Sequence, residues 1–526
     1  MQTSQLRTAL LLAALAGAAL LPSTLFAQAV TGVGDDATMP KRGELRFSVL
    51  SVWNAWSERY GQGTAGRPNG SVEPLGVNFN LDTIGIAQIE NLSAEQSAIR
   101  TLSGLPNFTS SLGTSRVQLH DNILSTPLSL ELGLTNRISV SVMVPFVTAT
   151  SNVDFTMNPT GHEATLGFNP TLIAPAASAV LASDAAFFAQ FDSASSQLFR
   201  AITACNAAPS TAGCAPINAN PAAARALITD ANNFTVRLAA VYGGRGGTTG
   251  NVFVPIAGTA AQTAIEAKIA AYKAMYAAYG TTGITSTGPV AAQAPLTATD
   301  MQNVFTNAAY GISAKPLATT IMRGLGDVEF GLKVNVLDPF HGSDSARFSP
   351  KGFNWRQSFG GIYRLGTGTL PSPADFTAIG TGDHQSSIQV KSFTDLLYGP
   401  HFWVSVVASY TSQMADQLAM RIPDSPSQVI LASYRQETVN RRLGNTVDIQ
   451  VTPRWNFNDY ISLAGQYYYR HKAADVYSGT FDVFDLNQNK LTLDASVLGM
   501  FTEASESRFG VGATYSTVGY VTRHKS

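Results

Sequence analysis

The sequence predicts an all-β fold, an antiparallel up-and-down transmembrane β-barrel of a bacterial outer membrane, with a helical extracellular insert. Residues 1–29 have the form of a cleaved secretory signal peptide, with one basic residue, an apolar run and the small-x-small ending Ala27-Gln28-Ala29. No later stretch of about 20 uninterrupted apolar residues follows it. The rest of the chain is rich in segments that alternate apolar and polar side chains. An exported chain of this kind is expected to cross the outer membrane with strands.

The composition supports this fold class and excludes one class of partner. Only 13% of the residues are charged, about half the usual share in soluble proteins, and the mean hydropathy is +0.06. Gly, Ser, Thr and Asn supply the polarity, which suits strands with one face toward lipid and one toward a lumen. The formal net charge of −1 leaves no basic stripe for phosphates, so nucleic acid is not an expected partner. A secreted β-sandwich or adhesin is the alternative.

The segment 326–337 shows the alternation most clearly. Apolar side chains at every even position from 328 to 336 fall on one face, and Asp327, Glu329 and Lys333 fall on the other. This gives one face to lipid and one to water over the about 9–11 residues that a tilted strand needs to cross a bilayer.

Tight polar turns between such segments predict hairpins. Thr135-Asn136-Arg137 joins strands at 128–134 and 138–146, with Asn136 as the positive-φ residue. Short connections alternate with long ones, which is typical of periplasmic turns and outer loops and favours a barrel over a sandwich. Further hairpins are expected at 388–396 with 402–410, 447–455 with 461–469, and 491–501 with 509–515, and further strands at 45–56 and 353–365.

The strand count leaves one alternative open. About eleven strands can be counted, whereas bacterial barrels have an even number. Either 76–89 is a further strand, or the chain as given lacks its last strand, and we expect the second, with about twelve strands in the intact protein. The expected divisions are a signal peptide at 1–29, a first barrel part at 30–157, an Ala-rich helical insert at 158–325 and a second barrel part at 326–526.

The insert changes to helical periodicity, and we expect it to lie outside the cell as a lid or to fold into the lumen as a plug. An apolar stripe from Ile265 to Tyr279, with Thr263 as cap and Gly280 as stop, predicts one helix. Further helices are expected at 221–241 and around 187–198.

The only two cysteines, Cys205 and Cys214, both lie in this insert. In an oxidising compartment a pair this close in sequence is expected to form a disulfide that closes a short polar loop. A redox or metal-binding pair is the functional alternative.

The sequence predicts no catalytic residues, no metal site and no cofactor. The seven histidines are scattered, without an i, i+4 pair or an HExxH helix, and no G-x-S-x-G motif is present. Asp383 beside His384 is the best arrangement for an outer-membrane hydrolase, against the simpler interpretation of a solvated loop pair.

Charged side chains on the predicted inward faces are the candidate lining of a lumen. They either line a water-filled path and set its selectivity, or pair across a narrow lumen and seal it, and both interpretations stay open. The lumen-lining candidates are Arg46, Glu131, Asp327, Glu329, Lys333, Arg356, Arg364, Asp448, Arg454, Arg470 and Asp494.

Two short motifs carry a family resemblance. The strand Gly324-Leu325-Gly326-Asp327-Val328-Glu329-Phe330-Gly331-Leu332-Lys333 resembles that of outer-membrane transporters, including the family associated with the meta-cleavage pathway of phenol degradation. Leu132-Gly133-Leu134-Thr135-Asn136-Arg137-Ile138, followed by Val144-Pro145-Phe146, looks like its companion hairpin. The match covers about a tenth of the chain. The resemblance implies a barrel and the uptake of hydrophobic compounds, although the long insert departs from the compact form of that family.

Three functional hypotheses follow. The first is a passive channel or transporter for small, hydrophobic molecules, a porin-like barrel surrounded by outer-membrane lipid. The second is a sealed structural barrel that displays residues 158–325 to a partner. The third, more distant, is an outer-membrane hydrolase. The sequence does not determine the oligomeric state.

Overall fold

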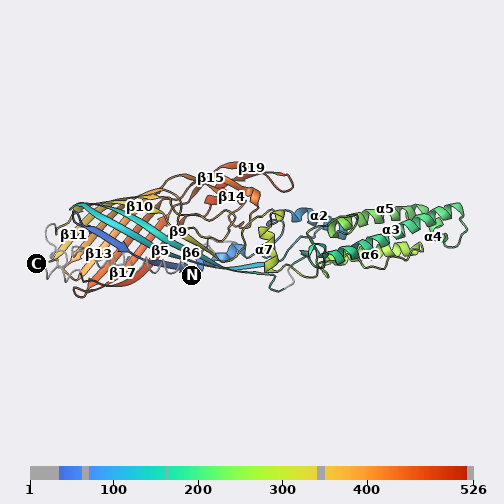
Figure 1. The fold of residues 1–526 in the computed structure, drawn as a ribbon, viewed down its shortest axis with the longest axis horizontal. Helices are drawn as coiled ribbons and strands as arrows, with labels where there is room; N and C mark the ends of the chain where they lie inside the picture. The colour runs from blue at the N-terminus through green and yellow to red at the C-terminus, as the bar shows by residue number, and fades with distance from the viewer. Residues whose placement is uncertain (1–34, 62–69, 161–163, 341–349, 518–526) are drawn as a thin grey trace, which may run out of the picture.

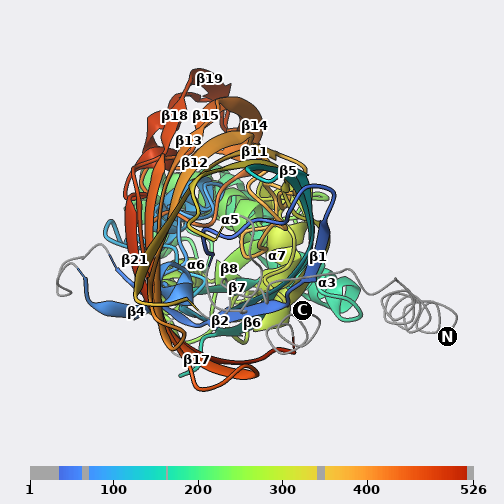
Figure 2. The same cartoon turned by 90° about the vertical axis from the view of Figure 1, so that its left-hand side faces the viewer.

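The protein is an elongated molecule with a curled β-sheet at one end and a bundle of helices at the other (Figure 1). The computed structural model describes residues 35–61, 70–160, 164–340 and 350–517. The predicted signal peptide lies outside the described residues. Viewed from the sheet end, the strands curve around an interior (Figure 2).

Among the described residues the main sheet contains twelve strands, and the pairs between them are antiparallel. Ten follow one path, β1-β5-β6-β10-β11-β12-β13-β16-β17-β21, while β2 pairs with β5 and β9 pairs with β6. Within the described part of the chain, β1 and β2 do not pair with β21, so the sheet is curled and open there. Its strands are β1 (Leu45–Val49), β2 (Val52–Trp56), β5 (Ser115–Thr135), β6 (Ile138–Met157), β9 (Thr320–Leu325), β10 (Val328–Leu337), β11 (Phe353–Leu365), β12 (Ser387–Tyr398), β13 (Phe402–Gln413), β16 (Thr446–Asn456), β17 (Ile461–Lys472) and β21 (Ala504–Tyr515).

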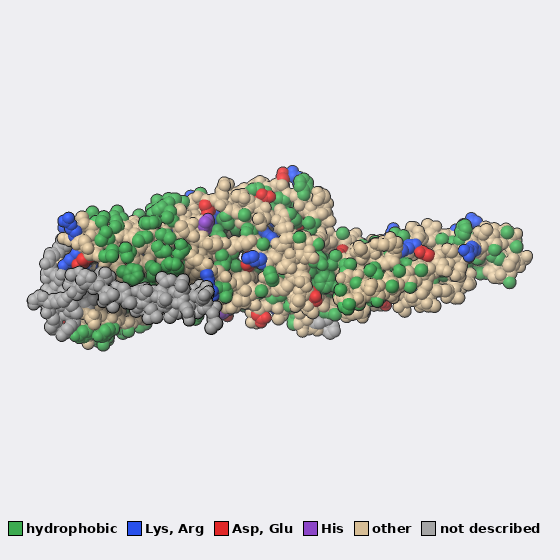
Figure 3. All heavy atoms as spheres, in the orientation of Figure 1, with side chains coloured by type: hydrophobic (Ala, Val, Ile, Leu, Met, Phe, Trp, Pro, Cys, Tyr) green, Lys and Arg blue, Asp and Glu red, His purple; other side chains and the backbone are tan. Residues whose placement is uncertain are grey.

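The predicted alternation sorts the side chains of these strands between two faces. On β10, Phe330 and Leu332 are each 48% exposed, whereas Lys333 is half-buried on the opposite face. On the side that Figure 3 shows, apolar side chains gather over the outer face of the sheet. A row of aromatic rings crosses this face near one end of the sheet, with neighbouring centroids 5.0, 6.3 and 5.9 Å apart. The row consists of Phe353, Tyr398, Phe402 and Trp455.

Three predicted hairpins are confirmed, because β5 pairs with β6, β12 with β13, and β16 with β17. The first differs from the prediction in its turn. Asn136 does not have positive φ; its side-chain oxygen instead accepts a hydrogen bond from the backbone N–H of Arg42 at 3.2 Å. In the second, Gly399 has φ 61° and supplies the left-handed turn residue.

The predicted hairpin of 491–501 with 509–515 is wrong. The chain from Lys490 to Asp494 forms β20, which pairs with β19 (Thr480–Phe484), and then enters the 3-10 helix η5 (Ala495–Gly499). Leu493 is buried in a small hydrophobic cluster at the rim of the main sheet. The apolar face of this alternating segment is therefore covered there and not by the main sheet. The 76–89 candidate is not a strand either, since it contains η1 (Leu75–Phe79) and no strand.

Short strands and 3-10 helices complete the rim and the connections. They are β3 (Glu58–Tyr60), β4 (Val72–Pro74), β7 (Leu166–Phe168), β8 (Phe253–Pro255), β14 (Asp416–Arg421), β15 (Gln436–Arg442), β18 (Val476–Ser478), η2 (Pro170–Leu172), η3 (Ala308–Tyr310) and η4 (Ser433–Arg435).

The helices begin and end largely where their local residues predict. Asn220 caps α5 by accepting from the backbone N–H of Ala223 at 3.0 Å. The cap predicted at Thr263 is wrong, because α6 begins one turn earlier and the side chain of Thr259 accepts from Gln262 N. The helices are α2 (Leu92–Ser103), α3 (Ala177–Ala207), α4 (Ala215–Ala219), α5 (Pro221–Tyr242), α6 (Ala260–Ala278) and α7 (Ala298–Thr306).

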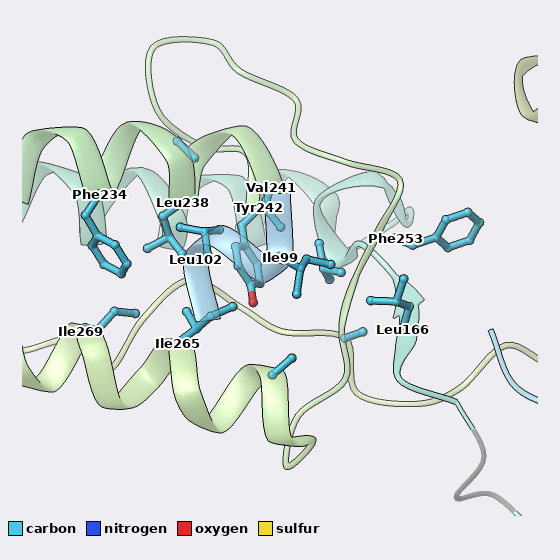
Figure 4. Packing of buried hydrophobic residues seen from close by; sticks show 14 of the residues in the cluster. Ile99, Leu102, Leu166, Phe234, Leu238, Val241, Tyr242, Phe253, Ile265 and Ile269 are labelled. Atoms are coloured by element: carbon cyan, nitrogen blue, oxygen red, sulfur yellow. The ribbon is translucent and has the colours of Figure 1, made fainter. Parts of the chain in front are cut away.

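The helices pack around a hydrophobic core to which α2, α5 and α6 all contribute (Figure 4), and this core continues to Val117 of β5 and Met157 of β6. Ile99 of α2, Leu238 of α5 and Ile265 of α6 are completely buried in it. Since α2 precedes β5 in the chain, the bundle combines two segments of sequence. A disulfide joins Cys205, at the end of α3, to Cys214, which caps α4. No helix in the described ranges is both long and apolar enough to cross a membrane.

Candidate functional site

The interior of the curled sheet contains a segment of chain that the sequence did not predict there. We call Asp35–Pro40 the inner segment. Ala37 is 0% exposed, its N–H donates to Asp395 Oδ2 at 3.2 Å, and its carbonyl oxygen accepts from Ser358 Oγ at 2.8 Å. These partners lie on β11 and β12, so the inner segment runs against the concave face of the sheet.

Two lysines on the concave face hold the inner segment. Lys333 Nζ donates to the carbonyl oxygens of Asp36 at 2.6 Å and Thr38 at 2.9 Å. Lys391 Nζ lies 3.0 Å from Asp35 Oδ2. A lysine with three donors can bind several acceptors at once, which suits it to fixing an irregular backbone.

A buried ion pair stands beside the segment. Arg356 Nη2 lies 2.9 Å from Asp395 Oδ2, and the two side chains are 3% and 2% exposed. Asp395 Oδ1 also accepts from Ser405 Oγ at 2.7 Å. Arg356 Nε is buried and has no hydrogen-bond partner in the described structure. A buried charge of this kind is stable only when its partners remain in place.

Six more predicted lining residues form three ion pairs across the strand ladder. Their pairing follows from the register, because opposite charges stand directly opposite each other on neighbouring strands. The pairs are Arg46 with Glu131 at 3.1 Å, Arg364 with Glu329 at 2.6 Å, and Arg470 with Asp448 at 2.5 Å.

Three other candidates have different positions. Asp327 lies between β9 and β10, where its carboxylate accepts from the backbone N–H groups of Gly368 and Asp383, both at 2.8 Å, and so fixes a loop. Arg454 is buried with its guanidinium 5.9 Å from the Trp403 ring centroid. Asp494 lies away from the main sheet and accepts from Ser496 N as the cap of η5, so its prediction as a lining residue is wrong.

The pair considered for hydrolysis does not form a catalytic arrangement in the described structure. His384 Nδ1 lies 2.6 Å from the carbonyl oxygen of Gly368, and the carbonyl of Asp383 accepts from Arg441 Nη2 at 2.9 Å. Both residues therefore serve the loop that Asp327 holds. In the ranges that the structure describes, no three His, Cys, Asp or Glu side chains gather as a metal site.

Sequence reasoning missed four charged residues of this interior: Asp35, Asp36, Lys391 and Asp395. The last two stand at alternate positions of the predicted strand 388–396, together with Phe393, so its alternation could have found them. Asp35 and Asp36 belong to a segment without periodicity and carry no such signal.

The comparisons with known proteins give the following similarities. No family model matches the chain, and no curated protein matches it. Among solved structures it is similar to an outer membrane channel from Pseudomonas putida F1, at 9% identity and a TM-score of 0.32, over 92% of this chain and 98% of that one. It is also similar to the Ralstonia pickettii toluene transporter TbuX, at 6% identity and a TM-score of 0.24, over 90% and 78%. A third is the outer membrane protease OmpT from Escherichia coli, at 7% identity and a TM-score of 0.20, over 76% and 87%. At such TM-scores these likenesses carry no argument, and the functional conclusion rests on the residues of this chain.

Proposed function

We propose that the protein is a bacterial outer-membrane channel through which small hydrophobic molecules diffuse passively. The observation that carries this proposal is the division of the main sheet into an apolar outer face and a charged inner face. Phe330 and Leu332 are half exposed on one side of β10, and Lys333 is bound to polar partners on the other. In water the exposed apolar face would be costly, whereas in a bilayer it is solvated by lipid.

The aromatic row at the end of the sheet supports this placement. Phe353 is 59% exposed, Tyr398 54% and Trp455 49%. Tyr398 and Trp455 border short turns, and Phe353 is the register partner of Tyr398 on the neighbouring strand. Aromatic rings prefer the boundary between lipid and water. We therefore place this end at the periplasmic interface, with residues 1–29 removed on export and 158–325 outside the cell.

Planar-bilayer recording of the mature chain tests the channel. The chain is first shown to fold by the heat-dependent gel mobility of barrels. We expect discrete conductance steps, which should grow when Lys333→Met and Lys391→Met together release the inner segment. A folded chain that is silent in both forms would contradict an open path.

The second candidate, a sealed barrel that displays the helices, is favoured by one observation. The helices α3, α5 and α6 lie at the end of the molecule away from the curled sheet, and they carry much of its largest hydrophobic cluster (Figures 1 and 4). Silence in both recordings, combined with cell-surface labelling of a cysteine introduced at Ser210, would support this candidate.

A further inference from the structure

The inner segment is bound to the concave face in the way that a ligand is bound. Asp35 offers a carboxylate to Lys391, and two carbonyl oxygens that follow it accept from Lys333. The positions of these donors are set by β10 and β12, which belong to the same continuous sheet. The acceptors belong to a stretch without secondary structure. The donors therefore form a site that the chain itself occupies.

The part of the concave face that surrounds the inner segment, called the wall below, carries more positive than negative charge. Lys333, Lys391, Arg356 and Arg454 all interact electrostatically with Asp35 or Asp36. Asp395 is the wall carboxylate that binds the segment, and it is already paired with Arg356. The carboxylates of Glu131, Glu329 and Asp448 are engaged by their own arginines. Removal of the segment would therefore leave the two lysines without a close counter-charge.

An apolar surface adjoins these cations. Ala37 packs against Phe393 and Val407, which are both 6% exposed. Lys333 Nζ lies 4.2 Å from the centroid of the Phe393 ring. A ring or short alkyl group in the place of Ala37 would pack against Phe393, while an attached anion would reach Lys333.

One buried hydrogen-bond donor beside the inner segment has no acceptor among the described residues. Arg356 is 3% exposed, and its Nε has no hydrogen-bond partner among the described residues. Burying a charged donor without a partner is unfavourable, and an oxygen-bearing ligand beside Asp395 would relieve that cost.

We propose that Lys333, Lys391 and Arg356, together with Phe393 and Val407, form a binding site for a small apolar carboxylate, such as an aromatic acid, which competes with the inner segment. The proposal rests on the channel function above and names the cargo class. The carboxylate takes the place of Asp35 on Lys391 and of the two carbonyl oxygens on Lys333, and the apolar group takes the place of Ala37. The inner segment thus narrows the path until such an acid displaces it.

Cysteine accessibility tests the proposal without any transport measurement. The probe is a charged maleimide acting on Ala37→Cys in the mature chain, whose native cysteines are joined to each other. Because residue 37 is completely buried, we expect slow labelling that sodium benzoate accelerates by about tenfold in a saturable manner. Benzyl alcohol, which lacks the carboxylate, and inorganic phosphate, which lacks the ring, should have no such effect.

Variants separate the proposed contacts from general damage. Lys333→Met with Lys391→Met should make Ala37→Cys react rapidly and without dependence on benzoate. Lys490→Met, which removes an exposed lysine from the rim, should leave both the rate and the benzoate response unchanged. Asp35→Asn should weaken the competitor and lower the benzoate concentration needed for half of the effect, which a folding defect would not do.

The outcomes distinguish the site from the channel. Labelling that benzoate does not change would overturn the carboxylate site, and so would an equal response to benzyl alcohol or to phosphate. A benzoate response in a chain without conductance would retain the site and refute the channel. Conductance without a benzoate response would retain the channel and refute the site.

Discussion

Asp184 provides the sharpest test of how the helical bundle is stabilised. Its side chain on α3 is 0% exposed; Oδ1 accepts from the backbone N–H of Val290 at 2.9 Å, and Oδ2 has no partner within the described structure. Burial raises the pKa of Asp184 to about 6. The perturbation is Asp184→Asn, which keeps the shape and the acceptor for Val290 but cannot ionise.

The expected magnitude follows from the pKa shift. In the unfolded chain the carboxyl group loses its proton near pH 4, whereas the folded chain keeps it to about pH 6. The free energy of unfolding of the wild-type bundle should therefore fall by about 3 kcal/mol as the pH rises from about 4 to 6. Above about pH 6 the contribution of Asp184 should no longer change with pH. Asp184→Asn should remove this fall and be more stable than wild type at neutral pH by up to about 3 kcal/mol.

Guanidinium unfolding of the mature chain, followed by circular dichroism of the helices, measures this difference. Subtracting the free energy of unfolding of the variant from that of wild type at each pH leaves the contribution of Asp184. The contributions of other groups cancel, such as that of Glu95, whose pKa burial raises to about 8. Asp192→Asn is the matched control, because Asp192 lies on the same helix and its side chain is 55% exposed. A difference between wild type and Asp184→Asn that does not change with pH would refute the reasoning.

Three further predictions concern single contacts. Replacing Cys205 and Cys214 by Ser should destabilise the end of the bundle by about 2–3 kcal/mol, seen as faster proteolysis between α3 and α5. Arg421→Met should leave three backbone carbonyls without their buried donor and lower the free energy of unfolding by about 2–4 kcal/mol. Hydrogen exchange at residues 310–314 should become faster, and protection equal to that of wild type would contradict this prediction. Phe187→Ala should cost about 3–5 kcal/mol in thermal unfolding, because Phe187 is completely buried, whereas Phe199→Ala, at a residue 64% exposed, should cost little.

The sequence predicted the parts of the fold that local pattern determines. The strands around Gly399 alternate on both sides of a tight turn, so their pairing needed no distant information. The same reasoning failed at Leu491–Leu493, where the alternation is real but the partner is β19 instead of the main sheet. A period of two identifies a strand and does not identify its neighbour.

The candidate site was predictable only in part for the same reason. Arg364 and Glu329 lie on neighbouring strands with one face charged, and both were predicted to face inward. The inner segment contacts Asp395, 358 residues away in sequence from Ala37, and no local pattern encodes such a contact. Asp494 stands on a strand face like a lining residue, but its strand belongs to the rim.

The lengths of β5 and β6 determine how far the protein reaches. They have 21 and 20 residues, about twice what a bilayer crossing requires. In the proposed orientation about ten residues of each strand project beyond the lipid, which is about 33 Å measured along the tilted strand, and the 31 residues of α3 have a length of about 45 Å. The disulfide-bonded turn would then stand far above the lipid surface. A phage or antibody arriving from the medium would meet this turn first, far from the pore itself.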